Sequence, residues 1–175
     1  EMFIRDSISM DPETGASMAM CSYPDFDPGN LKEVKDVAVF NNPSVFVSYE
    51  PGSVFKAVTL AAGMEAEKIN PNTTYVDKGV EEIDDYKIKN SDNKAHGVQT
   101  MQQVLEKSLN TGPIFVQRQL GKQLFYEFVQ KFGFGQKTNL GLSPEAAGNI
   151  SSLEKKGDIF AATASFGQGI TATPI

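Results

Sequence analysis

A proline–glycine break followed by an apolar helical run constrains this chain more than any other feature. Pro51 and Gly52 interrupt an extended segment, and an apolar run with helical spacing begins at Ser53 and continues to Met64. Ser53 is therefore expected near the N-terminus of a buried helix. Backbone N–H groups at that end have no intrahelical acceptor, and the helix dipole favours negative charge beside them. The sequence thus predicts a position where an oxyanion can be stabilised.

Lys56 follows Ser53 at a spacing that places both side chains on one face of a helix. A buried lysine loses part of its preference for the charged form, so it can accept a proton from a neighbouring hydroxyl. The pair therefore predicts a serine nucleophile with its own general base. The alternative is a serine that only starts the helix, beside a solvated lysine.

The Ser-x-x-Lys spacing is weak by itself, because it recurs elsewhere in the chain. Ser91 and Lys94 lie in a polar stretch, as do Ser152 and Lys155, and no apolar helix follows either pair. Both pairs are expected in solvated loops. Only Ser53 opens an apolar helix, so the catalytic interpretation is restricted to that pair.

Composition and charge exclude several functional classes. The 175 residues are 40% hydrophobic, which is enough for the core of one domain or of part of one. The net charge is −6 and the basic residues are scattered, so no nucleic-acid partner is expected. One cysteine, Cys21, and one histidine, His96, cannot assemble a Cys/His metal cluster, and no cofactor is indicated. No apolar run reaches about 18 residues, so this segment is expected to make no membrane contact.

The remaining patterns predict an α+β fold that begins with a β-hairpin. Two short segments, residues 3–10 and 16–22, flank a cluster of turn formers, which is typical of a hairpin. Cys21 is expected to pack within the second strand. Residues 77–94 are charged and predict short strands and loops in an exposed excursion. Helical spacing of apolar residues occurs at 98–105, 114–120, 124–132 and 159–164.

A second polar pair lies where one helical run ends and the next begins. Ser108 and Asn110 follow the run that ends at Leu105, and Thr111-Gly112-Pro113 restarts the chain into another helix. If the backbone is extended there, residues two apart project to the same side, so the hydroxyl and the carboxamide would face one cavity. The simpler interpretation is a turn whose side chains satisfy backbone groups.

A series of short sequences, taken in order, carries a family resemblance over nearly the whole chain. They are Asp11-Pro12-Glu13-Thr14-Gly15, Ser22-Tyr23-Pro24-Asp25-Phe26-Asp27-Pro28, Tyr49-Glu50-Pro51-Gly52-Ser53-Val54-Phe55-Lys56, Ser108-Leu109-Asn110, Phe132-Gly133-Phe134-Gly135, Glu145-Ala146-Ala147-Gly148 and Phe166-Gly167-Gln168-Gly169-Ile170. The chain resembles the transpeptidase domain of class B penicillin-binding proteins, the serine acyltransferases that cross-link bacterial peptidoglycan and are acylated by β-lactams. The shared order is more specific than any single motif.

The resemblance implies acyl transfer through a serine in cell-wall cross-linking. Ser53 would be the nucleophile and Lys56 the base that takes its proton. Ser108 would relay a proton to the leaving amine, and Asn110 would hold Lys56 and the substrate amide. The partners would be D-alanyl-D-alanine stem peptides and β-lactam antibiotics. Ser91-Asp92-Asn93 also has the form Ser-x-Asn, but the family places this motif at a corner between two apolar helices, which selects Ser108 and Asn110.

The family's third motif, Lys-Thr/Ser-Gly on a strand, is not found in this sequence, because Lys137-Thr138 is followed by Asn139 and lies in a loop. The resemblance therefore implies an incomplete transpeptidase fold over residues 1–175. Residues 1–23 would form a hairpin of the central sheet and residues 24–175 a mostly helical part, with the remaining strands missing. Loss of one oxyanion-hole donor typically costs about 10²–10³ in rate, so the isolated chain is expected to be inactive. The missing strands or a second copy could pair with its exposed strand edges.

The resemblance also implies an extracytoplasmic location, in a longer protein anchored by an N-terminal transmembrane helix. Two related functions share Ser53 and Lys56. A serine β-lactamase would need a deacylating carboxylate and an activated water, and nothing in the sequence marks one. A penicillin-sensing domain would be acylated without turnover.

Overall fold

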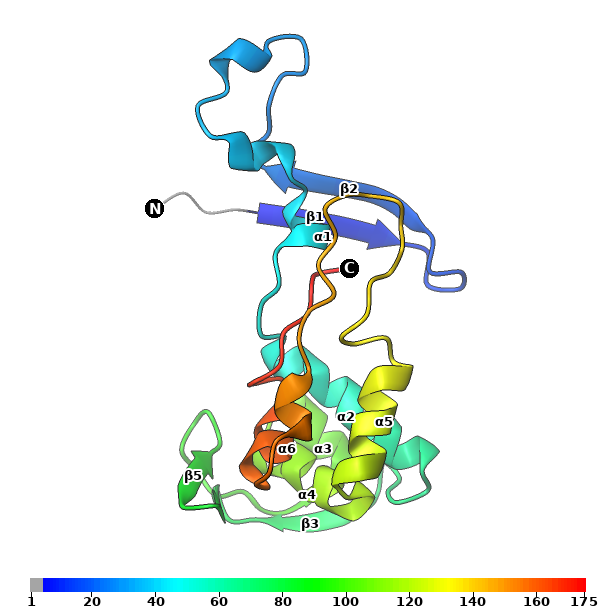
Figure 1. Ribbon diagram of the computed structural model, residues 1–175. Coiled ribbons are helices and arrows are strands. Elements are labelled where there is room, and N and C mark those ends of the chain that lie inside the picture. The colour runs from blue at the N-terminus through cyan, green and yellow to red at the C-terminus, as the bar shows by residue number, and fades with distance from the viewer. Residues whose placement is uncertain (1–4) are drawn as a thin grey trace.

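The chain forms a helical body and a narrower end that carries the N-terminal hairpin (Figure 1). The computed structural model describes residues 5–175. The α-helices described are α1 (Pro43–Phe46), α2 (Lys56–Glu65), α3 (Met101–Glu106), α4 (Thr111–Leu120), α5 (Lys122–Lys131) and α6 (Ile159–Ala164). The strands are β1 (Arg5–Met10), β2 (Ser17–Tyr23), β3 (Thr74–Asp77), β4 (Val80–Ile83), β5 (Tyr86–Lys89) and β6 (Gly97–Thr100). Short 3₁₀ helices occupy Leu31–Glu33, Val37–Phe40, Gly52–Phe55 and Ser151–Glu154.

The core lies in the body, where α2 packs against α4 and α5. Gly63 on α2 permits the close approach to α4, because a Cβ at this position would lie 2.6 Å from Val116 Cγ1. Burial of each large apolar side chain contributes about 1.5–3 kcal/mol, so this packing supplies most of the stabilisation. The apolar side chains with at most 1% exposure include Phe55, Met101, Val104, Ile114, Val116, Phe125, Val129 and Ile170.

Helix α5 confirms the amphipathic stripe expected over residues 124–132, except at its end. Phe125, Phe128 and Val129 are buried in the core. Phe132 is 50% exposed. The helix ends at Lys131, and Gly133 at φ +89° turns the chain away, so Phe132 no longer follows the buried face.

The N-terminal hairpin is present as the antiparallel pair β1–β2, with Ile8 opposite Met20. The expected strand residues Phe3 and Ile4 lie outside the described residues. Ile8 and Met20 are half-buried, and both strands contact α1. The expectation that Cys21 packs inside is wrong: its thiol is exposed. Successive strand residues point to opposite faces, so Cys21 lies on the face of β2 opposite to that of half-buried Met20.

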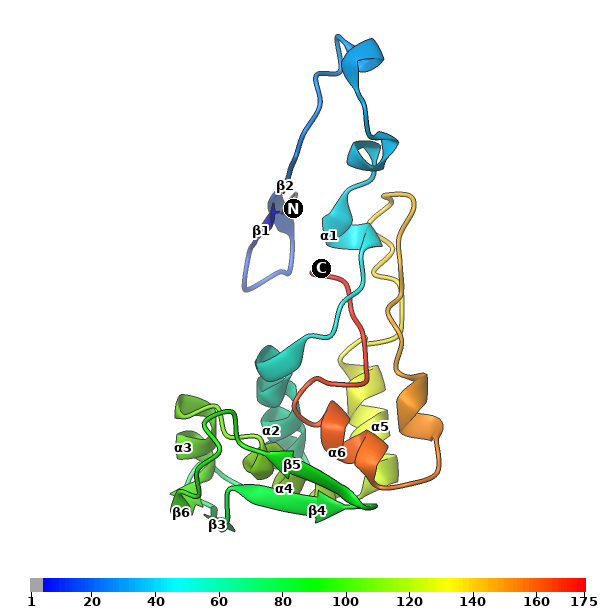
Figure 2. The same ribbon diagram turned by 90° about the vertical axis from the view of Figure 1, so that its left-hand side faces the viewer.

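The segment between α2 and α3 forms two small antiparallel sheets, β3–β6 and β4–β5, along one side of the body (Figure 2). The short strands are as expected and most of residues 77–94 are exposed, but two polar side chains are not. Asp77 is 1% exposed and Asn90 is 2% exposed, because both side chains turn inward to α4. Helix α3 begins at Met101, after a capping box formed by Thr100 and Gln103, so Val98 belongs to β6 and not to the expected helix.

The segment around Ser152 also differs from the expected solvated loop. It forms a 3₁₀ helix, and Leu153 on it is buried in the core. The Ser152 hydroxyl is buried and has no hydrogen-bond partner among residues 5–175. The polar composition of this segment therefore concealed a packing residue.

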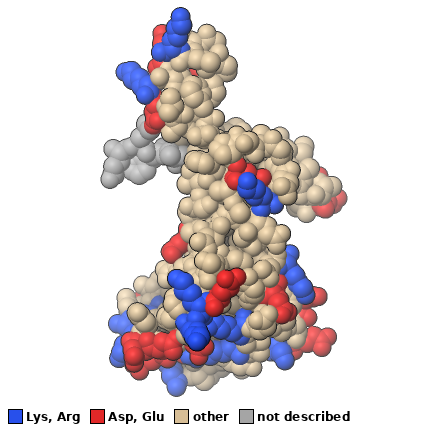
Figure 3. Space-filling view, viewed as in Figure 1, with Lys and Arg blue, Asp and Glu red and all other residues tan. Residues whose placement is uncertain are grey.

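Charged side chains gather on the body, while the middle of the molecule is mostly uncharged in the view of Figure 3. The C-terminus lies in that middle region, near β1 and α1 (Figure 1). Within residues 5–175, none of the helices has the length and apolar character that a bilayer crossing requires.

Candidate active site

Ser53 stands at the entrance to α2, exposed to solvent. The chain enters the helix through the 3₁₀ turn Gly52–Phe55, and α2 continues from Lys56. Gly52 has φ +58°, a left-handed conformation that glycine adopts without strain. The turn presents the Ser53 hydroxyl outward and leaves backbone N–H groups of the first turn without intrahelical acceptors.

The turn before Ser53 is held by the segment Phe166–Ile170, far away in sequence. The Gly52 N–H donates to Gly167 O at 3.0 Å, and the Gly169 N–H donates to Glu50 Oε1 at 2.8 Å. A Cβ on Gly167 would collide with the Gly52 backbone, so only glycine permits this approach. Two of the sequences that carried the family resemblance therefore meet in space and fix the position of Ser53.

Lys56 is buried, with 1% of its surface exposed. Its Nζ donates to Ser108 O at 2.6 Å and to Ser108 Oγ at 3.0 Å. Burial lowers the pKa of Lys56 from its ordinary value of 10.5 to about 8. A general base must be in its neutral form. The neutral fraction of Lys56 near neutral pH is therefore far larger than that of a solvated lysine.

The structure brings Lys56 and Ser108 together, and Ser53 lies one helical turn from Lys56. Among residues 5–175, however, no hydrogen bond joins the Ser53 hydroxyl to Lys56 Nζ. Catalytic hydrogen bonds are often loose in an unliganded enzyme and tighten when substrate binds. The pair thus has the expected proximity along the helix without a formed contact.

The turn from Ser108 to Asn110 connects α3 to α4, as expected, but its backbone is not extended. Ser108 has φ +52°, in the left-handed region, and Asn110 has helical dihedral angles of −83° and −31°. The backbone argument that would place both side chains on one side is therefore wrong. Instead, the turn directs both the carbonyl and the hydroxyl of Ser108 at Lys56.

The Asn110 side chain has a partner that sequence reasoning missed. Its Nδ2 donates to Lys89 O at 2.8 Å, at the end of β5. The described residues contain no hydrogen bond between Asn110 and Lys56. Its Oδ1 makes no hydrogen bond within residues 5–175 and remains able to accept one.

Four further polar residues form a hydrogen-bond network next to this turn, and none of them belongs to a sequence motif. They are Tyr75, Asp77, Asn90 and Thr111. Burial raises the pKa of Tyr75 to about 12, so its hydroxyl stays protonated and donates to Thr111 Oγ1 at 3.0 Å. Asp77 and Asn90 come from the stretch 77–94, whose charge suggested solvent exposure. No local sequence pattern marks these residues, because tertiary packing decides whether an acidic side chain faces inward beside an Asn and a Thr.

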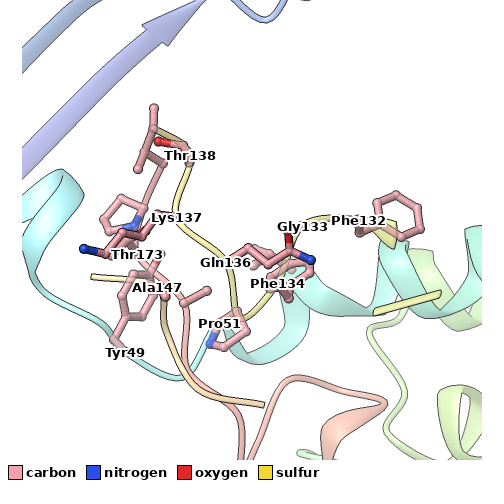
Figure 4. A pocket seen from close by; sticks show the side chains of 14 residues that line it. Tyr49, Pro51, Phe132, Gly133, Phe134, Gln136, Lys137, Thr138, Ala147 and Thr173 are labelled. Carbon is pink, nitrogen blue, oxygen red and sulfur yellow. The ribbon is translucent and has the colours of Figure 1, made fainter. Parts of the chain in front are cut away.

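A hollow of about 350 Å³ lies next to the site but does not contain it (Figure 4). Tyr49, Pro51, Phe134 and Thr173 contribute to its lining, which includes none of the four expected catalytic residues. Within the described residues, no group of three or more His, Cys, Asp or Glu side chains is arranged to hold a metal ion.

Residues 8–175 match the family model of the penicillin binding protein transpeptidase domain. The chain belongs to this family. The match covers nearly the whole chain and confirms the resemblance drawn from the motifs. The α+β architecture agrees with it.

Similar proteins of known name agree with this assignment. Stage V sporulation protein D of Bacillus subtilis is 40% identical over 171 residues, which are 97% of this chain and 26% of that protein. The peptidoglycan D,D-transpeptidase FtsI of Escherichia coli K12 is 29% identical over 169 residues, 97% of this chain and 28% of FtsI. The chain thus spans about a quarter of the length of these relatives.

Solved structures show the same fold. A putative peptidoglycan glycosyltransferase from Atopobium parvulum superposes with a TM-score of 0.87 at 31% identity, covering 97% of this chain and 39% of that chain. The transpeptidase domain of penicillin-binding protein 3 from Burkholderia pseudomallei superposes with a TM-score of 0.81 at 22% identity, covering 97% and 46%.

Proposed function

We propose that this chain carries the nucleophile half of a serine D,D-transpeptidase that cross-links peptidoglycan and is acylated by β-lactams. One observation carries the proposal: a buried lysine of lowered pKa, Lys56, follows exposed Ser53 on α2 and is hydrogen-bonded to Ser108. The printed name of the Escherichia coli relative, peptidoglycan D,D-transpeptidase, supports the reaction class.

In the acylation step, the Ser53 hydroxyl attacks the carbonyl of a D-alanyl-D-alanine stem peptide while neutral Lys56 takes its proton. The Ser53 N–H, in the first turn of the helix, donates to the oxyanion of the tetrahedral intermediate. The intermediate collapses as the peptide C–N bond breaks, and Ser108 passes a proton from Lys56 to the departing D-alanine amine. The product is an ester on Ser53.

In the second step, an amine of a neighbouring stem peptide attacks the ester carbonyl. Lys56 and Ser108 accept the proton of this amine and return one to Ser53, whose C–O bond breaks. The free Oδ1 of Asn110 accepts a hydrogen bond from the substrate amide. A β-lactam follows the first step alone, because its amide bond opens within the ring and the leaving amine stays attached.

The same proposal places the protein outside the cytoplasm, where peptidoglycan strands are joined, with a membrane anchor elsewhere in the longer protein. The proposed catalytic set on this chain is Ser53, Lys56, Ser108 and Asn110. The hydrogen bonds of Lys56 to Ser108, and the position of Asn110 in the same turn as Ser108, support it.

The test is covalent labelling of the full-length protein with benzylpenicillin, followed by peptide mass mapping. We expect one penicilloyl adduct, on the peptide that contains Ser53. An adduct on Ser91 or Ser152, or no adduct at all, would contradict the proposal. Rapid hydrolysis of nitrocefin by the same protein would indicate a β-lactamase instead.

A second measurement separates this chain from the complete domain. The chain of 175 residues alone is expected to show no stoichiometric labelling unless a polypeptide that carries the Lys-Thr/Ser-Gly strand is supplied, because loss of one oxyanion-hole donor already costs about 10²–10³ in rate. Equal labelling of both would show that residues 1–175 suffice for acylation.

A further inference from the structure

We propose that Asp77 and Asn90 are positioning residues that hold the Ser108–Asn110 turn in its catalytic geometry. The proposal rests on the proposed transpeptidase function. Neither residue belongs to a catalytic motif, and both lie in the two-sheet segment between α2 and α3 (Figure 2). Their side chains are 1% and 2% exposed, which is unusual for polar residues unless their hydrogen bonds are satisfied.

Asp77, at the end of β3, is surrounded by donors. Its Oδ1 accepts from the Gly79 N–H and from Thr111 Oγ1, each at 2.8 Å. Its Oδ2 accepts from Asn90 Nδ2 at 2.8 Å and from the His96 N–H at 3.1 Å. All four partners are donors, which is the full bonding pattern of a carboxylate. Asp77 thus connects the two-sheet segment between α2 and α3 to the first turn of α4.

Asn90 carries this connection to the catalytic turn. Its Nδ2 donates to Asp77 Oδ2, which fixes the carboxamide orientation. Its Oδ1 then accepts from the Asn110 N–H at 2.9 Å. The preceding residue adds a second contact, because Lys89 O accepts from Asn110 Nδ2. Both the backbone and the side chain of Asn110 are therefore held by Lys89-Asn90.

The turn needs such support because its conformation is costly. Ser108 has φ +52°, which costs a residue other than glycine free energy and persists only where the surroundings enforce it. One side of the turn is held by Lys56 through the Ser108 carbonyl and hydroxyl. The other side is held by Asn90. Loss of the Asn90 contact leaves Asn110 held only by its side-chain bond to Lys89 O, so the backbone of the turn can relax and move Ser108 away from Lys56.

The principal experiment compares Asn90→Ala with Asp84→Gly in the full-length protein. Asp84 lies in the turn of the same β4–β5 hairpin, but its Oδ2 accepts from the N–H groups of Asp158 and Ile159. It has φ +47°, so glycine is tolerated there. Asp84→Gly therefore removes comparable hydrogen bonds from the hairpin without touching the catalytic turn.

We expect Asn90→Ala to slow acylation by a labelled penicillin about tenfold, since a buried donor loses its acceptor next to the catalytic groups. Asp84→Gly should keep the rate of the unmodified protein within about twofold, because surface changes of this kind rarely act at a distance. Acylation of Asn90→Ala at the unmodified rate, or equal slowing by both variants, would overturn the proposal.

A reversed pair supplies the rescue. Asn90→Asp sets two carboxylates against each other, and Asp77→Asn places an NH₂ group among the donors that surround the native carboxylate. The double variant Asp77→Asn/Asn90→Asp removes the repulsion between the two carboxylates: the amide at position 77 can donate to the carboxylate at position 90, which retains an oxygen for the Asn110 N–H, while the His96 N–H loses its acceptor. We expect the double variant to be acylated faster than Asn90→Asp alone. Additive losses would show that the two residues do not act as a unit.

Site-resolved amide hydrogen exchange separates this proposal from the proposed function. In Asn90→Ala the Asn110 amide should exchange faster, while core amides of α4 keep their protection. That result requires no reaction. If the unmodified protein is not acylated by penicillin, the proposed function fails; if the Asn110 amide stays protected in Asn90→Ala, the positioning proposal fails.

Discussion

Side chains of the same type are buried in the body of this molecule and exposed to solvent at its hairpin end. Met101 in the body is 1% exposed, whereas Met18 on β2 is 70% exposed. Val116 on α4 is fully buried, whereas Val37, beyond the hairpin, is 73% exposed. The buried core is therefore concentrated in the body, where α2 follows the turn that carries Ser53 and packs on α4. Apolar composition alone does not locate the core.

The largest effect of a substitution in the body is expected from removal of the Ser53 hydroxyl, the proposed nucleophile. Ser53→Ala in the full-length protein should lower the rate of penicillin acylation by a factor on the order of 10³ or more, because the proposed reaction forms its ester on the Ser53 hydroxyl. Ser91→Ala is the matched control, because Ser91 belongs to a second Ser-x-x-Lys sequence, in the two-sheet segment between α2 and α3. This variant should leave the rate unchanged. Acylation of the Ser53 variant at the unmodified rate would show that another residue is the nucleophile.

Truncation of a buried methionine gives the next effect. Met101→Ala should reduce the free energy of unfolding by about 2–5 kcal/mol, because the lost side chain leaves a cavity in the core. Denaturant unfolding of the chain measures this loss. A change below 1 kcal/mol would show that the body tolerates voids and would weaken the contrast with the hairpin end.

The pH dependence of acylation tests the environment of Lys56 within the body. Its pKa is lowered to about 8 by burial, and the base must be neutral. The acylation rate should therefore rise about tenfold per pH unit up to about pH 8 and then level off. The same shift destabilises the fold below pH 8 and is relieved as pH rises from about 8 towards 10.5. A flat rate between pH 6 and pH 8 would contradict the assignment of Lys56 as base.

The smallest effect is expected at the hairpin end. Met18→Ala makes the same chemical change as Met101→Ala but should alter the free energy of unfolding of the chain by less than about 0.5 kcal/mol, because the side chain is already solvated. A larger loss would mean that the β2 side chain is covered in solution, for example by a second copy of the chain. Sedimentation analysis at several concentrations would distinguish that case.

Local pattern determined the elements on which the site stands. The break at Pro51-Gly52 and the apolar run after it predicted a helix near Ser53, and the structure has a 3₁₀ turn over Gly52–Phe55 that continues into α2 at Lys56. The corner at Ser108 followed from the end of one apolar period and the start of the next. These features depend on neighbours in sequence, so the residues themselves disclose them.

Tertiary structure alone decided how these pieces act together. The contact of Lys56 with Ser108 joins residues far apart in the chain, and the left-handed conformation of Ser108 exists only because surrounding contacts impose it. Asp77 and Asn90 looked like solvated residues, because their burial depends on donors supplied by α4 and its preceding turn. Periodicity records which face of an element is apolar; it does not record which polar groups will meet when those faces are packed together.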